Sequence, residues 1–314
     1  MPEPRVLVIR GGAIGDFILT LPAIQLLREN IPGAHIEIIG YKSILDLALA
    51  SGLANETRHL EHGSMAKLFV PNVPLDEALM TYFRSFNLVI SYLFDPDGFF
   101  RGNMERIGVK TFLEASHRVE VGQGHAAEQL AKPLEKLAMY LENPAPTLIM
   151  PDTVFLPDER PVLAVHPGSG SLKKNWPTSR WIETGREVAS AHPHWRLALV
   201  TGEAEAERGI TDALLQGWQG LDYLHWDHLP LPDLAARLAA SDAYIGHDSG
   251  IGHLAAAVGL PSLLLFGPTD PAVWAPRNVG VRVLLEETGD LSLLGTPPVW
   301  EALFRLLAAY PPDA

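Results

Sequence analysis

The stretch GHDSGIGHLAAAVGLPSLLLFGPTD, residues 246–270, decides the fold of this chain. A short apolar run, AYIG, ends at Gly246, and two residue types that favour helix N-caps, Asp248 and Ser249, follow it. A helix is predicted from about Ser249, and a second apolar run, SLLLFG, begins at Ser262. Strand, helix and strand in this order predict a parallel sheet covered by helices on both faces.

The same stretch contains the residue types of a serine hydrolase triad, since Asp248, Ser249 and His253 lie within six positions. A nucleophile elbow, G-x-S-x-G, requires glycine two positions before and two positions after the serine. Those positions hold His247 and Ile251. The hydrolase interpretation is therefore rejected.

The glycines of this stretch favour a phosphate site instead. Gly250 and Gly252 open the predicted helix, where unpaired N–H groups carry a partial positive charge. His253 is expected one turn in, facing the same opening, and a histidine simply packed under the loop is the alternative. The next junction, FGPTDP, repeats the pattern with Thr269 or Asp270 as a cap. Together these junctions predict one diphosphate site in the second half of the chain.

The alternation of strands and helices extends outward from this stretch in both directions. The 314 residues exceed what one core usually organises, and a proline-rich segment, residues 143–161, is a candidate linker. We predict two α/β domains, residues 1–150 and 151–314, with a closing helix at about 298–310. The first half has predicted strands at residues 5–10, 35–40 and 88–93 and predicted helices at 17–29 and 124–141. The second half has strands VLAVHPG, RLALVTG, AYIG and SLLLFG and helices from about Pro177, Glu203, Leu231 and Ser249.

Composition limits the function classes. Hydrophobic residues make up 47% and charged residues 19%, as in a globular protein, and the formal net charge of −13 argues against nucleic-acid binding. The absence of cysteine excludes thiolate metal sites and a cysteine nucleophile. No secretory signal and no apolar run long enough to span a bilayer are found, so we expect a cytoplasmic protein whose membrane contact, where it has any, is peripheral.

The junction RGGAIGDFILTLPA, residues 10–23, precedes the first predicted helix. A dinucleotide fingerprint in this frame needs glycine at position 10, which is Arg10, although Gly12 and Gly15 fit. Asp16 lies instead at the helix start, where the dipole favours the ionised carboxylate. A general base facing an open loop and an ordinary helix cap are both consistent with this position.

The junction HPGSGSLKKNWP, residues 166–177, combines a flexible loop with two lysines. Gly168 and Ser169 belong to a loop whose main-chain N–H groups can approach an anion, and Lys174 adds charge before a helix that Pro177 can begin. The spacing is not that of a P-loop. An exposed loop with solvated lysines is the alternative.

These motifs, in this order and spacing, resemble glycosyltransferase family 9, the family of the ADP-heptose:lipopolysaccharide heptosyltransferases. The resemblance rests on RGGAIGDFILTLPA, HPGSGSLKKNWP, TGEAEAE and the 246–270 stretch. It implies a GT-B fold, with two Rossmann-like domains facing across a cleft, the acceptor held mainly by the first domain and the nucleotide sugar by the second. In this fold the closing helix commonly crosses back to the first domain.

The resemblance also implies roles for individual residues. Asp16 matches the general base, and Lys174 matches the lysine that contacts the donor phosphates. Glu203 or Glu205 matches the acidic residue that holds the ribose. The expected donor site comprises Gly168, Ser169, Lys174, Glu203, Glu205, Asp248, Ser249, Gly250, Gly252 and His253, and the expected acceptor-side loop comprises Arg10, Gly12 and Gly15.

The implied activity is inverting transfer of a sugar, above all a heptose from ADP-heptose, to an inner-core lipopolysaccharide or related lipid-linked saccharide at the inner membrane. No cofactor and no metal are expected, because Lys174 and helix N-termini can replace a divalent cation; the letters DPD at Asp95 to Asp97 fit a turn in the first domain. Among basic residues, Arg10, Lys42, Arg101 and Arg106 are candidates for acceptor binding. A non-catalytic nucleotide-sugar binder and a two-domain NAD-dependent enzyme remain the alternatives.

Overall fold

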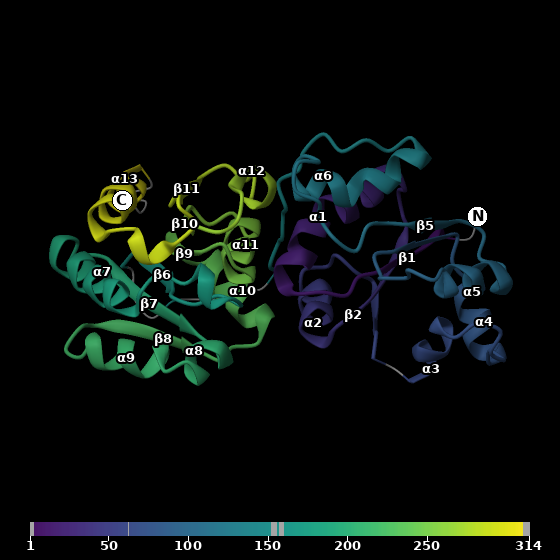
Figure 1. Ribbon diagram of the computed structural model, residues 1–314, viewed down its shortest axis with the longest axis horizontal. Helices are drawn as coiled ribbons and strands as arrows, with labels where there is room; N and C mark the ends of the chain where they lie inside the picture. The colour runs from purple at the N-terminus through teal and green to yellow at the C-terminus, as the bar shows by residue number, and fades with distance from the viewer. Residues whose placement is uncertain (1–2, 62, 152–155, 157–159, 310–314) are drawn as a thin grey trace. The chain divides into compact units, whose positions relative to one another are not determined.

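The computed structural model describes residues 3–61, 63–151, 156 and 160–309, and it divides into two compact units (Figure 1). The first unit is Met1–Pro144 and the second is Ala145–Ala314. Each unit contains one parallel sheet with helices around it.

The first unit has a five-stranded parallel sheet in the order β3-β2-β1-β4-β5. Its strands are β1 (Arg5–Ile9), β2 (His35–Gly40), β3 (Glu56–His59), β4 (Leu88–Ser91) and β5 (Phe112–Glu114). Its α-helices are α1 (Ile14–Asn30), α2 (Lys42–Ala50), α3 (Gly63–Ala66), α4 (Glu77–Arg84), α5 (Phe99–Ile107) and α6 (Ala126–Ala131), with 3-10 helices η1 (Lys67–Phe69) and η2 (Lys132–Leu137). The chain reverses its direction of strand addition between β1 and β4, and ligands bind beside such a point in open α/β sheets.

The second unit has a six-stranded parallel sheet in the order β11-β10-β9-β6-β7-β8. Its strands are β6 (Val162–His166), β7 (Arg196–Thr201), β8 (Tyr223–Asp227), β9 (Ala243–His247), β10 (Ser262–Phe266) and β11 (Val281–Leu285). Its helices are α7 (Thr178–Ala191), α8 (Glu203–Glu207), α9 (Ile210–Gly217), α10 (Leu231–Ala239), α11 (Gly250–Ala257), α12 (Pro271–Trp274) and α13 (Thr296–Ala309), with 3-10 helices η3 (Leu172–Lys174) and η4 (Leu291–Leu293). The corresponding reversal lies between β6 and β9, beside the 246–270 stretch.

The predicted alternation of strands and helices is confirmed, with one helix wrong. The helix expected over residues 124–141 is shorter, because α6 ends at Ala131. The chain continues as the 3-10 helix η2, which has Pro133 in its first turn and is followed by the C-cap residue Ala138 at φ 58°. Proline removes an N–H donor and clashes with a continuing α-helix, which explains the change of helix type. The helix expected from about Ser249 begins at Gly250, with Ser249 as its N-cap.

The closing helix α13 packs into the core of the second unit. Val299, Leu303, Leu306 and Leu307 are buried in one cluster with apolar side chains of the sheet and of α7. This packing buries one side of α13 within its own unit. The crossing of this helix to the first unit, which the resemblance implies, stays a prediction. Tyr310, the last residue of the expected helix, lies outside the described residues.

The proline-rich segment 143–161 is described only in part, since residues 152–155 and 157–159 lie outside the described ranges. Just after the division between the units, Leu148 is buried and its N–H donates to the carbonyl of Ala257 at 2.8 Å. Throughout the described part of the chain, no helix is both long enough and apolar enough to cross a bilayer.

Candidate functional site

The central strands of the second unit end at one edge of its sheet, where four loops carry polar side chains. Because all strands are parallel, the loops after β6, β7, β9 and β10 leave from the same edge. Lys174 follows β6, Glu205 follows β7, Asp248 follows β9 and Thr269 follows β10. This is the edge at which parallel α/β sheets bind ligands.

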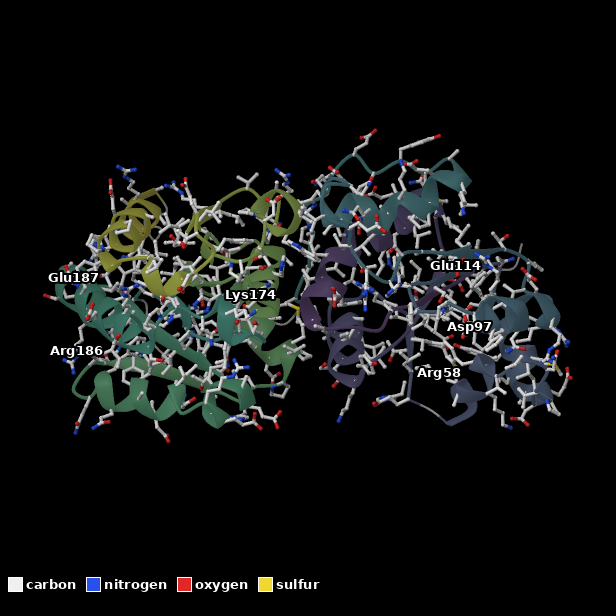
Figure 2. All side chains as sticks on the ribbon, in the orientation of Figure 1. Arg58, Asp97, Glu114, Lys174, Arg186 and Glu187 are labelled. Carbon is white, nitrogen blue, oxygen red and sulfur yellow. The ribbon has the colours of Figure 1, made fainter. Side chains whose placement is uncertain are left out.

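Asp248 is the centre of a charged cluster at this edge. Its Oδ2 accepts hydrogen bonds from Lys174 Nζ and from Thr269 Oγ1, each at 2.6 Å (Lys174 is labelled in Figure 2). Its Oδ1 lies 3.4 Å from His253 Nε2. The Asp248 side chain is 6% exposed, whereas that of Lys174 is 27% exposed, so the lysine side chain is partly accessible to solvent while the aspartate is not.

The charge of Asp248 is fixed by these neighbours. Burial by itself raises the pKa of this carboxyl, but His253 and Lys174 outweigh burial and hold the pKa well below its usual range. The carboxylate is therefore ionised at neutral pH. Its position is set by three side chains from three different junctions, so it can hold a lysine in one place.

The N-terminus of α11 opens directly beside this cluster. Ser249 caps the helix, and its Oγ accepts from the N–H of Gly252 at 3.2 Å. A side chain at position 252 is excluded, because an added Cβ would lie 2.6 Å from the carbonyl oxygen of His247. Gly252 thus lets the first helical turn lie against the end of β9. The remaining N–H groups of this turn, beginning at Gly250, are the ones that can receive an anion.

His247 ties the loop after β6 to the end of β9. Its Nε2 accepts from the backbone N–H of Trp176 at 2.7 Å, so its other nitrogen, Nδ1, carries the proton and donates to the Gly168 carbonyl at 3.2 Å. Burial lowers the pKa of His247 to about 4, despite the Gly168 carbonyl and Asp248, which act to raise it. A neutral imidazole therefore fixes both ends of the segment that contains Lys174.

Glu205 and Gly168 fit together beneath this loop. An added Cβ on Gly168 would lie 1.7 Å from Glu205 Oε1, so glycine is required there. The Glu205 carboxylate accepts from the N–H of Gly202 at 2.8 Å and lies 3.7 Å from His166 Nε2. Burial raises the pKa of Glu205 and lowers that of His166 to about 3. Glu203, the other candidate, is exposed on the outer side of α8.

Ser169, expected among the donor-binding residues, is turned into its own loop. Its hydroxyl lies 2.6 Å from Asn175 Oδ1 and 2.7 Å from the Ser171 carbonyl, and the side chain is buried. Arg208 donates to the Ser169 carbonyl at 2.6 Å. The hydroxyl therefore shapes the loop and is not presented to a ligand.

In the first unit, Asp16 is held at the start of α1 by two groups. Its Oδ2 accepts from the N–H of Ala13 at 2.9 Å, and its Oδ1 lies 3.6 Å from Arg10 Nη2. Arg10 is 2% exposed and also donates to Thr20 Oγ1 at 3.1 Å, so it positions Asp16 and is itself out of solvent. The Asp16 side chain is 38% exposed. Asp16 is therefore both a helix cap and an accessible carboxylate.

The glycines of this first junction make room for that arrangement. Gly12 has φ +101°, and an added Cβ there would lie 2.7 Å from Asp16 Oδ2. Gly15 lies within the first turn of α1. Of the expected acceptor-side residues, Arg10 and Gly12 thus lie against the carboxylate of Asp16, and Gly15 precedes it in the helix.

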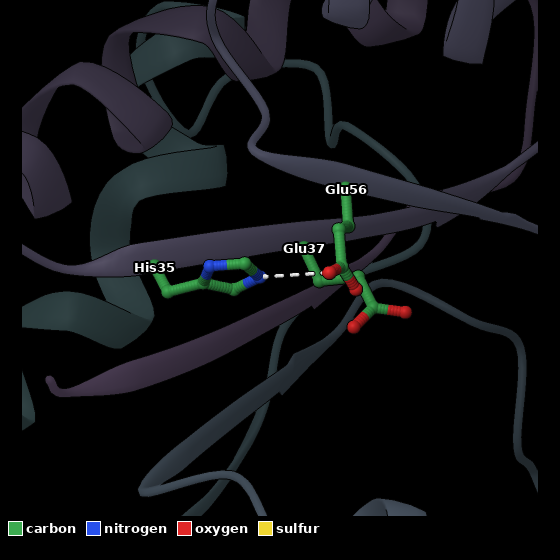
Figure 3. A group of neighbouring side chains, drawn as sticks. All are labelled: His35, Glu37 and Glu56. Carbon is green, nitrogen blue, oxygen red and sulfur yellow. Dashed lines mark ion pairs between the residues drawn. The ribbon is translucent and has the colours of Figure 1, made fainter. Parts of the chain in front are cut away.

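A third polar cluster, His35, Glu37 and Glu56 on β2 and β3, has the composition of a metal site (Figure 3). The buried Glu37 carboxylate is already engaged: it accepts from Tyr82 Oη at 2.5 Å and lies within 3.4 Å of nitrogens of Arg5 and Arg58. Two guanidinium groups at this distance repel a cation. We assign the cluster a structural role in fixing the sheet.

The structure thus brings Lys174, Asp248 and His253 into one cluster and Gly168 and Glu205 into another at the same sheet edge. The sequence analysis missed His247, which it used only to reject the nucleophile elbow. It left Thr269 or Asp270 open as the cap of α12. Asp270 is the cap, accepting from Ala272 N at 2.8 Å, whereas Thr269 binds Asp248. The position of His247 directly before the Asp-Ser pair was the available signal for its role.

Comparisons with known proteins identify relatives of this chain and of its fold. The family model of glycosyltransferase family 9 (heptosyltransferase) matches residues 114–293. Lipopolysaccharide heptosyltransferase 1 of Pseudomonas aeruginosa is 28% identical over 291 residues, which cover 85% of this chain and 79% of that protein.

Solved structures show the same fold at low sequence identity. A glycosyltransferase family 9 protein of Veillonella parvula superposes with a TM-score of 0.77 at 18% identity, covering 98% of this chain and 97% of that one. The E. coli heptosyltransferase WaaC with ADP superposes with a TM-score of 0.72 at 17% identity, covering 96% of this chain and 99% of that one. Two parallel-sheet α/β domains of the GT-B type are therefore common to these chains.

Proposed function

The chain belongs to glycosyltransferase family 9, and from this membership we propose that it transfers a heptose from ADP-heptose to an inner-core lipopolysaccharide or related saccharide, with inversion at the anomeric carbon. The carrying observation is the cluster in which the buried carboxylate of Asp248 holds the ammonium of the partly exposed Lys174 beside the N-terminus of α11. The names of the relatives, lipopolysaccharide heptosyltransferase 1 and a WaaC bound to ADP, support the choice of sugar, nucleotide and acceptor.

The second unit supplies the donor side of the proposed reaction. As the bond between the anomeric carbon and the diphosphate oxygen breaks, negative charge grows on the departing nucleoside diphosphate. Lys174 and the N–H groups at the start of α11 are fixed before the reaction and need little reorganisation to meet that charge. Asp248 keeps Lys174 in place, and Thr269 and His253 keep Asp248 in place.

The first unit supplies the base. The acceptor hydroxyl attacks the anomeric carbon from the face opposite the leaving diphosphate, and its proton passes to the carboxylate of Asp16. Arg10 and the Ala13 N–H fix this carboxylate, while its 38% exposure leaves it reachable by a hydroxyl. The balance is one new C–O bond, one broken C–O bond and one proton taken up by Asp16.

The acidic residue proposed to recognise the ribose is Glu203 or Glu205. The Glu205 carboxylate is buried beside His166 and Gly168 at the end of β6, whereas Glu203 is exposed at the start of α8. Gly168 and Gly252 have no side chain that could block an approaching donor. We propose that no metal or organic cofactor takes part, because Lys174 and the α11 N-terminus supply the positive charge that a divalent cation would bring.

The acceptor and its location complete the proposal. A lipopolysaccharide precursor is lipid-linked, so we propose peripheral contact with the inner membrane from the cytoplasmic side. Binding of a lipid-free and a lipid-linked form of the same core saccharide can be compared. The lipid-free form measures the affinity due to the sugar, and the difference between the two forms measures the affinity due to membrane contact.

The test is transfer by the purified protein from ADP-heptose to lipopolysaccharide that lacks heptose. We expect one heptose added to the acceptor by mass spectrometry, with one ADP released per transfer. Thermal unfolding with ADP, UDP and GDP then tests the nucleotide, because a ligand that binds only the folded state raises the Tm with its concentration. No added heptose together with an equal response to all three nucleotides would contradict the proposal. Release of ADP without saccharide product, or ADP binding without turnover, would instead indicate a hydrolase or a non-catalytic binder.

A further inference from the structure

Strand β11 is an edge of the second sheet, and its open side is largely apolar. It pairs with β10 on one side, and none of the described strands lies on its other side. Val283 is 37% exposed and Leu285 is 43% exposed, and Val279, just before the strand, is 95% exposed. An edge of this kind presents main-chain groups that can pair with a further strand.

The other edge strands carry features that discourage such pairing. β3 has two charged side chains, Glu56 and Arg58, in its four residues, and β5 has only three residues. β8 places His225 and Asp227 near its end. Charged side chains and short length protect an edge from strand addition. β11, with the sequence VRVLL, has Arg282 as its one charge and is the most apolar of the described edges.

Main-chain groups of β11 face outward at alternate residues. Glu286, just after the strand, faces β10, since its N–H donates to the Phe266 carbonyl at 2.8 Å. Direction alternates along a strand, so Leu284 also faces β10. The N–H and C=O groups of Val283 and Leu285 therefore point away from β10, and a further strand has to bond to these two residues.

We propose that β11 pairs with β11 of a second copy of this chain, in an antiparallel arrangement whose two-fold axis passes through Leu284. In this register Val283 of one copy lies opposite Leu285 of the other, and such a pair exchanges main-chain hydrogen bonds. Arg282 of each copy lies opposite Glu286 of the other. The two sheets become one continuous sheet, and the inference goes beyond the proposed function and does not depend on it.

Charge complementarity favours a second copy and selects this register. Because outward-facing residues must lie opposite each other, the axis passes through a residue. With the axis at Val283, Arg282 lies opposite Leu284, and with the axis at Arg282 two guanidinium groups lie opposite each other. With the axis at Leu285, Glu286 lies opposite Leu284. Only the axis at Leu284 places opposite charges together, and opposite charges stabilise a cross-strand pair whereas like charges destabilise it.

The side chains are already arranged for this pairing. Leu284 packs against the buried cluster of the second unit, so Val283 and Leu285 lie on the other face of the strand, where pairing covers their exposed surface. Glu286 is held in place, since its Oε2 accepts from Asp290 N at 3.1 Å. A single strand pair is smaller than a standard interface, so we expect a Kd of about 10–100 µM.

The test measures association of the full chain by sedimentation velocity. We expect wild type to be mainly monomer at about 1 µM and mainly dimer at about 200 µM. Arg282→Glu and Glu286→Arg each place like charges opposite each other, so each alone should stay monomeric at about 200 µM. An equimolar mixture of the two restores opposite charges at both positions, and native mass spectrometry should detect their heterodimer. Glu287→Arg is the matched control, because Glu287 lies opposite Val281 in this register and its loss should leave the dimer intact.

A second variant covers the case in which Glu286→Arg does not fold, since Glu286 also holds the following turn. Val283→Lys/Leu285→Lys places lysines opposite each other on the exposed face, so it should keep the wild-type Tm and stay monomeric. Wild type that is still a monomer at about 200 µM would overturn the proposal. A dimer that persists in Arg282→Glu or in the lysine variant would also overturn it, as would a mixture of the two folded charge variants that forms no heterodimer. None of these measurements depends on heptose transfer, so failure of the proposed function is a separate result.

Discussion

Two junctions, β1 to α1 in the first unit and β9 to α11 in the second, are built from the same parts and use them differently. Each has a buried parallel strand, a loop with glycines, an aspartate and a helix N-terminus. At the first junction the aspartate is Asp16, inside the helix start, and its side chain is 38% exposed. At the second it is Asp248, before the N-cap, and its side chain is 6% exposed.

The difference in partners decides what each carboxylate can do. Asp248 has Lys174, Thr269 and His253 around it, which use both of its oxygens, so it is committed to holding a cation. Asp16 accepts one backbone N–H and has one arginine at 3.6 Å, so its oxygens retain capacity for a proton from a ligand. Local sequence chemistry is thus shared, and the surrounding contacts separate an accessible carboxylate, the proposed base, from a carboxylate committed to a cation.

The largest expected effect separates these roles at the first junction. Asp16→Asn keeps a side-chain oxygen that can accept from the Ala13 N–H but removes the basic carboxylate. We expect kcat to fall by about 10²- to 10⁴-fold with little change in Tm or in ADP affinity. Steady-state kinetics with ADP-heptose measures kcat, and thermal unfolding followed by circular dichroism, without and with ADP, measures the Tm and the effect of ADP binding. Turnover within a few-fold of wild type would show that Asp16 is not the base. The two aspartates would then both have only a positioning role.

A second change tests whether the buried carboxylate of Asp248 serves to hold the Lys174 cation. Lys174→Met should lower kcat by about 10²- to 10³-fold, because the charge that meets the leaving diphosphate is lost. It should also lower the free energy of unfolding by about 1–3 kcal/mol, since a buried carboxylate loses its cation while Lys174 is itself partly exposed.

The double variant Lys174→Met/Asp248→Asn is the control for that interpretation. With the buried charge removed, stability should return toward wild type while activity stays low. Urea unfolding and kinetics on the same three proteins measure the two effects. Recovery of activity in the double variant, or equal stability of wild type and Lys174→Met, would contradict the coupling.

Sequence analysis found the interior strands of both sheets and missed the outer ones. The predicted strands correspond to β1, β2, β4, β6, β7, β9 and β10, which have neighbours on both sides. The strands it did not predict are β3, β5, β8 and β11, which are the edges of the two sheets. Interior parallel strands are buried on both faces and form continuous apolar runs, whereas an edge strand such as ETRH at β3 is largely exposed and has no such run.

The site was predictable in residue type but not in direction. Asp16, Lys174, Asp248 and the pair Glu203 and Glu205 were named from motif and spacing. That Glu205 packs against Gly168 while Glu203 is exposed could not be predicted, because it depends on which side of α8 faces Gly168. The inward turn of Ser169 could not be predicted either, since it depends on Asn175 bending back toward it. Contacts between junctions, such as Thr269 on Asp248, require the order of strands in the sheet, which local sequence does not contain.

Acid should lower the stability of the fold through two buried imidazoles of the second unit, His166 at the end of β6 and His247 at the end of β9. Burial lowers the pKa of His166 to about 3 and that of His247 to about 4, below the value of about 6.5 expected in the unfolded chain. As pH falls from 7 to 5, the unfolded state gains protons that the folded state does not, so the free energy of unfolding falls by about 2 kcal/mol for each histidine.

His166→Gln isolates one of these contributions, because Nδ1 of His166 has no hydrogen-bond partner among the described residues and its Nε2 is 3.7 Å from Glu205. The difference in unfolding free energy between pH 7 and pH 5 should be smaller in this variant by about 2 kcal/mol. Urea unfolding at both pH values gives the double difference. The same pH dependence in variant and wild type would show that His166 is protonated in the folded state.

The last comparison adds one methyl group to a glycine loop of each unit, and its smallest effect is expected after β1. Gly168→Ala places a Cβ 1.7 Å from Glu205 Oε1, so either the loop or the carboxylate must move, and we expect a loss of about 1–3 kcal/mol in unfolding free energy. Gly11→Ala places its Cβ at 3.5–3.8 Å from Leu60, Tyr41 and Leu93, which are ordinary contact distances. Its unfolding free energy should change by less than about 1 kcal/mol, and the reduced freedom of the unfolded chain favours a small gain. Urea unfolding of the two variants beside wild type makes the measurement, and ADP binding should weaken only in Gly168→Ala. Equal destabilisation by both substitutions would show that the loop after β1 is as tightly packed as the loop after β6, and the contrast between an open carboxylate and a committed one would then have to rest on charge alone.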